Sequence, residues 1–130
     1  MNSFKTLNNL TGGLVFLIAF IVMCFSVESS GSLWDCGEFV SGAFKLQVVH
    51  PPGAPLFLLV GRIFTMFAEL FSKDPSNIAF SVNLMSGMCN ALTAMFVCWS
   101  AVILAKLALV GRDGELDMPQ SIAEIGRAHV

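Results

Sequence analysis

The chain alternates between long apolar blocks and short polar connections. The three blocks cover about residues 10–27, 54–71 and 78–104. Each approaches the ~20 residues that a helix rising ~1.5 Å per residue needs to cross a hydrocarbon layer of ~30 Å. They predict an all-α integral membrane protein with three transmembrane helices. The polar loop 28–53 lies between the first two blocks, and we expect it to hold a short helix followed by a proline-rich segment.

Local signals within this loop predict where its parts begin and end. Ser32 can cap a short helix that runs through Phe44. The prolines between Pro51 and Pro55 predict an extended approach to the second membrane helix, because residues before proline avoid the helical region. Proline itself is tolerated in the first turn of a helix.

The positions of the basic residues predict an orientation. Lys5 precedes the first block and Lys73 lies between the second and third. By the positive-inside rule, loop 28–53 is then on the outer side and the connection 72–77 is cytoplasmic. Lys106 and Arg112 would follow the third helix on the outer side, so the excess of basic residues on the cytoplasmic side is small. The first block also fits a cleaved signal peptide, which leaves the loop outside as well.

Composition agrees with a membrane protein. Hydrophobic residues make up 55% and charged residues only 12% of the chain, against about 25% charged in soluble domains, and the mean hydropathy is +0.77. A net charge of -2 shows no basic excess, so we expect no nucleic-acid partner. The four cysteines lack metal-ligand spacing and are interpreted as packing residues.

Three ionisable residues of the loop are candidates for chemistry: Asp35, Glu38 and His50. Positions three apart share a face of a helix, so the two carboxylates would point into one site. Such a pair can divide into a base and a charge stabiliser, or can jointly hold a divalent cation. A solvated acidic face and a loop or capping histidine are the alternatives. No cofactor is certain.

Arg62 stands out because it lies within the second apolar block. A cation at the centre of a membrane helix costs about 2.5–3.5 kcal/mol, so such residues usually have a function. The phosphate of a lipid is one partner that we expect, and an acid or a carbonyl of a helix missing from this chain is the alternative. We expect Glu69, two turns away, to be too far for a direct ion pair.

The third block carries a stripe of small and amide side chains at helical spacing. Its members are Asn83, Gly87, Asn90 and Ala94. A stripe of this composition is typical of close helix packing in membranes and does not indicate chemistry.

Two motifs resemble the signature of a known family. They are Trp34-Asp35-Cys36-Gly37-Glu38 and the later run from His50 through Pro-Pro-Gly-Ala-Pro-Leu to Phe57. Together they resemble a bacterial multi-spanning family, long described as a domain of unknown function, to which a eukaryotic endoplasmic-reticulum protein O-mannosyltransferase belongs. The resemblance covers about residues 13–122. This family is in turn similar to the C-type glycosyltransferases, whose active site lies among membrane helices on the outer face.

The resemblance implies an enzyme that transfers a sugar, expected to be mannose, from a polyprenyl-phosphate-linked donor to a protein hydroxyl. It implies a multi-pass protein of the bacterial inner membrane. Asp35 maps to the expected base, and Glu38 and His50 complete the candidate catalytic set. Trp34 and Arg62 are the candidate substrate-binding residues. The rival interpretation is a non-enzymatic transporter or assembly component, in which the outer loop gates or docks a partner.

The C-terminal residues predict a different origin. Residues 125–130, IGRAHV, are the translation of the common sequencing-adapter string ATCGGAAGAGCACACGTC, and Glu124 fits its preceding bases. We therefore interpret 124–130 as adapter translation. Residues 1–123 are then expected to be the N-terminal part of a longer membrane protein, inactive by itself.

Overall fold

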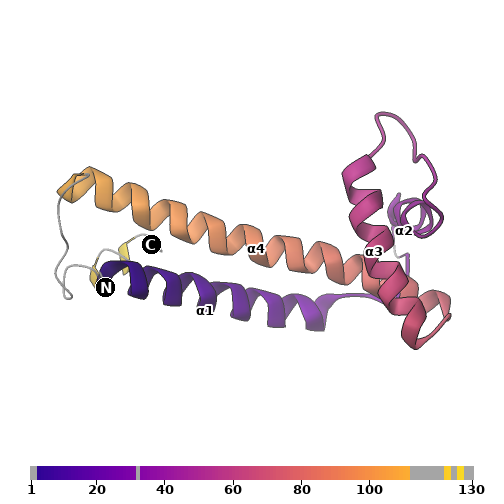
Figure 1. Ribbon diagram of the computed structural model, residues 1–130, viewed down its shortest axis with the longest axis horizontal. Coiled ribbons are helices and arrows are strands. Elements are labelled where there is room, and N and C mark those ends of the chain that lie inside the picture. Colours follow the sequence, from indigo (N-terminus) through magenta and orange to yellow (C-terminus); the bar gives the residue numbers. More distant parts are fainter. Residues whose placement is uncertain (1–2, 32, 112–121, 124–125, 128–130) are drawn as a thin grey trace. The chain divides into compact units, whose positions relative to one another are not determined.

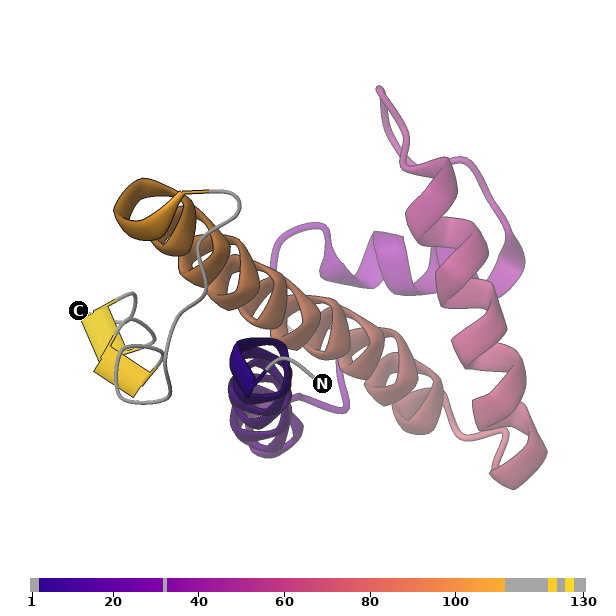
Figure 2. The same cartoon turned by 60° about the vertical axis from the view of Figure 1, so that its left-hand side comes forward.

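The computed structural model describes residues 3–31, 33–111, 122–123 and 126–127, and the regular structure of this part is entirely helical. Its main elements in chain order are α1 (Ser3–Ser26), α2 (Cys36–Lys45), α3 (Pro55–Phe71) and α4 (Pro75–Val110) (Figures 1 and 2). The all-α prediction is confirmed. The adapter interpretation falls largely on residues outside the described part and stays a prediction.

Two of the helices are long and apolar enough to cross a membrane. They are Phe4–Ser26 within α1 and Pro75–Val110. The helix α3 has the bounds expected of the second apolar block, but it is only 17 residues long and carries Arg62 and Glu69. The described part of the chain thus contains two candidate spans, and a third is not confirmed.

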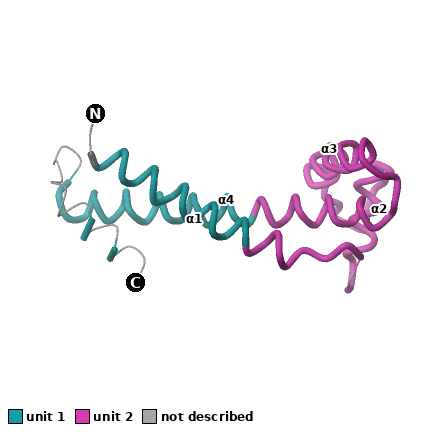
Figure 3. Tube along the Cα trace, turned by 90° about the horizontal axis from the view of Figure 1, so that it is seen from below, with its two compact units in different colours: residues 1–21, 90–130 teal, residues 22–89 magenta. Residues whose placement is uncertain are grey.

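The chain divides into two compact units, and α1 and α4 contribute to both (Figure 3). In the unit Met1–Ile21 with Asn90–Val130, the two helices run antiparallel. Trp99 donates a hydrogen bond from Nε1 to the Asn8 carbonyl at 3.2 Å. Lys106 lies 5.1 Å from the centre of the Phe4 ring. Lys106 is therefore at the same end of this helix pair as the N-terminal residues.

The unit Val22–Cys89 has its core between α2, α3 and the first half of α4. The helices α2 and α3 cross in contact (Figure 2). They pack tightly at Gly61, where an added Cβ would lie 2.8 Å from the Cβ of Ala43. The buried core residues are Ala43, Val49, Leu58, Val82 and Met85. This packing holds α2, which carries the candidate carboxylates, on α3.

The connection from α2 to α3 is a turn, not an extended run. α2 ends at Leu46, which has the left-handed conformation at φ 52°. The chain then reaches a tight turn over residues 50–53, closed by a 2.9 Å hydrogen bond from the Gly53 N–H to the His50 carbonyl. The extended approach predicted for the proline run is therefore wrong, because this bond folds the prolines back. Pro55 does occupy the first turn of α3, as expected.

The start of α2 also differs from the prediction. Ser32, the expected cap, lies outside the described residues, and the helix begins at Cys36 with Asp35 in the capping position. The Asp35 side chain makes no capping hydrogen bond. Its carboxylate is thus left available for contacts outside the helix.

Close packing on the stripe of α4 is confirmed at Gly87. An added Cβ there would lie 3.1 Å from the Cβ of Met23 and 3.6 Å from Val27. A side chain at position 87 would require Met23 to move away by a few tenths of an ångström.

Candidate functional site

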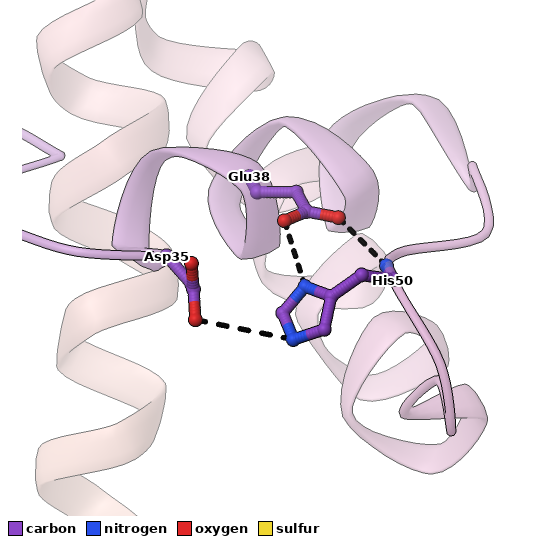
Figure 4. Close-up of side chains that lie close together, drawn as sticks. All are labelled: Asp35, Glu38 and His50. Carbon is purple, nitrogen blue, oxygen red and sulfur yellow. Dashed lines mark hydrogen bonds and ion pairs between the residues drawn. The ribbon is translucent and has the colours of Figure 1, made fainter.

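The His50 imidazole lies between the carboxylates of Asp35 and Glu38 (Figure 4). Its Nδ1 is 2.9 Å from Glu38 Oε2, and its Nε2 is 3.9 Å from Asp35 Oδ2. The His50 backbone N–H donates a second hydrogen bond, of 2.7 Å, to Glu38 Oε1. The structure therefore brings together the three residues that were proposed as catalytic, two from the start of α2 and one from the turn that follows it.

Local structure explains this arrangement. Asp35 and Glu38 stand three residues apart at the beginning of α2 and face the same side, as helical spacing predicts. His50 reaches them from the first position of the proline turn. Phe39 packs edge-on against the His50 ring, with centroids 5.9 Å apart, and against Phe57 at 5.5 Å. The aromatic contacts join the imidazole to the α2–α3 core and limit its rotation.

The electrostatics of the pair follow from its hydrogen bonds. The pKa of His50 is raised above its ordinary value, chiefly because Glu38 accepts a hydrogen bond from its ring and attracts the imidazolium. The pKa of Glu38 is lowered, chiefly by the side-chain hydrogen bond from His50 and then by the backbone one. The hydrogen bonds between Glu38 and His50 therefore favour the charged forms of both groups.

The two carboxylates differ in what they are free to do. Both oxygens of Glu38 accept hydrogen bonds from His50. Asp35 is beyond hydrogen-bond distance of the imidazole at 3.9 Å, and its side chain is 45% exposed. Glu38 is therefore engaged by His50 through both oxygens, whereas Asp35 makes no hydrogen bond to the imidazole, although the two side chains are about equally exposed, at 42% and 45%.

The same cluster could hold a divalent cation. One ligand atom from each of Asp35, Glu38 and His50 can be chosen so that all three lie within 4.8 Å of one another. Two carboxylates and an imidazole suit a transition metal such as Mn²⁺ or Zn²⁺ better than Mg²⁺. A cation would have to replace the proton between Glu38 and Nδ1, so metal binding and the hydrogen-bonded pair compete.

Trp34, expected to bind substrate, is next to the cluster in sequence but makes no part of it. Its side chain is 96% exposed, and its backbone has the left-handed φ of 54°. The role in binding substrate that the sequence suggested for Trp34 stays a prediction.

Arg62 is paired within the α2–α3 unit. Its Nη1 donates to the Phe44 carbonyl at 2.7 Å and lies 3.3 Å from Glu69 Oε2. The guanidinium also lies over the Phe44 ring, 5.3 Å from its centre. The prediction that Glu69 is too far away is wrong, because residues seven apart share a helix face and both side chains extend along it. The acid and carbonyl alternative describes these contacts, and both partners belong to this chain.

Asn83 is the residue whose role the sequence did not reveal. Its amide binds the polypeptide on both sides of Asp35: the Glu28 and Ser30 carbonyls accept from Nδ2, and Cys36 donates to Oδ1. An amide at helical spacing was visible in the sequence, but its loop partners lie about 50 residues away and could not be read from any local pattern.

These observations define a class: a helical membrane protein with two span-length helices and a solvent-open cluster of two carboxylates and an imidazole. Comparison with known proteins identifies the family. The model of the protein O-mannosyl-transferase TMEM260 N-terminal domain matches residues 35–130. The chain belongs to this family. The matched segment includes Asp35, Glu38, His50 and Arg62, and it begins one residue after Trp34.

Curated relatives agree. The protein O-mannosyl-transferase tmem260 of Dictyostelium discoideum is 30% identical over 84 residues, which cover 65% of this chain and 10% of that protein. Protein O-mannosyl-transferase TMEM260 of Mus musculus is 31% identical over 96 residues, 72% of this chain and 13% of its own length. The chain thus spans about a tenth of the curated relatives that it matches. No solved structure matches it.

Proposed function

We propose that this chain is part of a membrane glycosyltransferase that moves mannose from a polyprenyl-phosphate-linked donor to a hydroxyl group of a protein, with Asp35 as the general base. The names of the relatives support the reaction class and the protein acceptor. The observation that carries the residue assignment is the different engagement of the two carboxylates: His50 hydrogen-bonds to both oxygens of Glu38 but lies 3.9 Å from Asp35. The bacterial inner membrane, implied by the family resemblance, is part of the proposal.

The reaction balances with a single base. The acceptor hydroxyl oxygen attacks the anomeric carbon of the donor sugar, and its proton passes to the Asp35 carboxylate. The bond between the anomeric carbon and the phosphate oxygen breaks, and its electron pair leaves with the lipid phosphate. A phosphate leaving group needs no protonation, so a general acid is not required.

The charge that develops on the phosphate calls for a nearby cation. Arg62 was the sequence-based candidate, but its guanidinium is already shared between the Phe44 carbonyl and Glu69. The His50 imidazolium, favoured by Glu38, is the positive charge nearest to Asp35 in this cluster. We therefore assign His50 to charge stabilisation and Glu38 to holding His50 in place.

The test is transfer of labelled mannose from a polyprenyl-phosphate donor to a hydroxyl-bearing acceptor peptide, in membranes that contain the full-length protein. Asp35→Asn keeps the shape of the side chain and removes the base. We expect transfer to fall at least about 10²-fold, equivalent to about 2.7 kcal/mol of barrier. Glu28→Gln, an exposed acid of the same loop, is the matched control. Near-parental transfer by Asp35→Asn at equal expression would refute the assignment.

Two alternatives give different results in this assay. If the cluster acts through a divalent cation, a chelator abolishes transfer and Glu38→Gln costs about as much as Asp35→Asn. If the chain is instead a transporter or assembly component, the full-length protein transfers no sugar, and the Asp35 variant alters transport or complex formation.

We also propose that the protein crosses the membrane twice in this segment, with α2 and α3 on the outer side. Beside Gly87 lies the end of α1, at Met23 and Val27, and beside Asn83 lies the loop that follows, at Glu28 and Ser30. The chain leaving α1 therefore advances toward the N-terminus of α4. The eight residues 75–82 continue for ~12 Å in the same direction at ~1.5 Å each.

In this proposal the connection 72–74 lies on the same side as the site, whereas the sequence-based expectation was a cytoplasmic location. The proposal agrees better with the positive-inside rule, because Lys5 and Lys106 would share the cytoplasmic side. An impermeant thiol reagent applied from outside should label Lys73→Cys as readily as Ser30→Cys. Labelling of Ser30→Cys alone would restore α3 as a third span.

A further inference from the structure

One side chain, Asn83 of α4, binds both ends of the short segment that carries Asp35. Its Nδ2 donates to the Glu28 carbonyl at 3.0 Å and to the Ser30 carbonyl at 3.1 Å. The Cys36 thiol donates to its Oδ1 at 3.6 Å, within the range for sulfur. Both amide hydrogens and the amide oxygen are thus used, and all three partners belong to one loop.

Gly31, next to one of these ends, lies close to the start of α2. An added Cβ at Gly31 would lie 2.9 Å from the Cα of Gly37, so the chain before the segment touches the first turn of α2. Asp35 directly precedes Cys36, and its own side chain makes no capping bond that would hold it. The position of its carboxylate relative to α4 therefore depends on the contacts that its neighbours make with Asn83.

Glu38 is held differently. It lies in the first turn of α2, and His50, which follows from the proline turn, hydrogen-bonds to both of its oxygens. The two carboxylates consequently have separate supports: Glu38 from the α2–α3 side and Asp35 from α4. A change at Asn83 should disturb Asp35 and leave the pair of Glu38 and His50 in place.

We propose that Asn83 is a positioning residue that fixes Asp35 for proton transfer. The proposal rests on the function proposed above, in which Asp35 is the base. A helix-packing role, the ordinary explanation for an amide in a membrane helix, does not account for its contacts, because its three hydrogen bonds go to a loop and the start of α2 instead of a neighbouring transmembrane helix.

The expected effect is on the rate of transfer and not on donor binding. A displacement of about 1 Å in a catalytic group can cost ~10²-fold, so Asn83→Ala should lower kcat by about 10- to 100-fold. The KM for the polyprenyl-phosphate donor should stay near the parental value, because Asn83 is not expected to contact the donor. Asn90→Ala is the matched control, since Asn90 is an exposed asparagine two turns further along the same helix.

A second measurement is independent of the enzyme activity. Cys36 is partly exposed and bonded to Asn83, so its reaction with a soluble maleimide, resolved by mass spectrometry of the Cys36 peptide, reports whether the segment is held. Asn83→Ala should react severalfold faster than the parent, and Asn90→Ala should match the parent. If Asn83→Ala accumulates poorly, the isosteric Asn83→Asp carries the test, because it sets a carboxylate against the Glu28 and Ser30 carbonyls and should lower kcat as well.

The outcomes are distinct. Faster labelling of Cys36 together with a lower kcat and an unchanged KM supports the proposal. Unchanged labelling overturns it, and so does faster labelling with parental kcat. If the parent itself transfers no sugar, the proposed function fails, and the labelling alone then decides whether Asn83 holds this loop.

Discussion

Gly61 offers the sharpest test of how the site is supported. It lies where α3 crosses α2, and an added Cβ would lie 2.8 Å from the Cβ of Ala43. Carbon atoms pack best at about 3.5–4.0 Å, so Gly61→Ala must move the two helices apart by about 1 Å. The neighbouring atom belongs to a short side chain fixed to the backbone, so no rotamer change can relieve the contact.

The magnitude follows from the cost of overpacking. Inserting a methyl group into a well-packed core typically costs about 1–3 kcal/mol. That corresponds to a change of about 5- to 150-fold in the unfolding equilibrium, at ~1.4 kcal/mol per tenfold. Because α2 carries Asp35 and Glu38, the same displacement should lower transfer activity.

The assay is denaturant unfolding of the full-length protein in detergent, with sugar transfer measured on the same preparations. Gly37→Ala is the matched control, since a Cβ there meets nothing within 4 Å and gains helix propensity of up to about 1 kcal/mol. The double variant Ala43→Gly, Gly61→Ala removes the clash and should recover part of the stability. If Gly61→Ala is as stable as Gly37→Ala, the close crossing of α2 and α3 is refuted.

Two further predictions concern the charged groups. The raised pKa of His50 means that its pairing with Glu38 stabilises the fold fully below about pH 6.5 and is lost as the pH rises through the raised value. The lowered pKa of Glu38 means that the same pairing is lost as the pH falls below about 4.5 and through the lowered value. The thermal stability of the parent should therefore decrease at both low and high pH. The thermal stability of Glu38→Gln should depend less on pH. Arg62→Leu should destabilise the protein by about 1–3 kcal/mol, because it leaves Glu69 and an α2 carbonyl without their partner. Adding Glu69→Leu should restore part of that loss in the same unfolding assay, whereas a raised KM for the donor with unchanged stability would return Arg62 to a phosphate-binding role.

The helices could be predicted because the signals that form them are local. The bounds of α3 agree with the predicted block to within a residue, since Pro55 opens it and the polar run after Phe71 ends it. The shared face of Asp35 and Glu38 follows from helical geometry alone. Membership of the family was also readable, because the two motifs that carry it are short and contiguous in sequence.

Whether α3 spans the membrane was beyond these local signals. Its length and apolar character suggested a span, but a charged pair within the helix and the packing of one face on α2 are tertiary facts. The orientation of the connection 72–74 likewise depends on which part of α4 lies beside the end of α1. Hydropathy reports how apolar a segment is and says nothing about its neighbours.

Composition, helix positions and the candidate residues Asp35, Glu38 and His50 were therefore determined by the sequence itself. Only the tertiary structure decided which contacts each of them makes. It turned the proline run back so that His50 hydrogen-bonds to Glu38 while its ring stays 3.9 Å from Asp35. It also brought the Asn83 side chain of α4 to the loop. The physical reason is that these contacts join residues 12 to 55 positions apart, and their geometry depends on how the helices pack and not on any pattern within one segment.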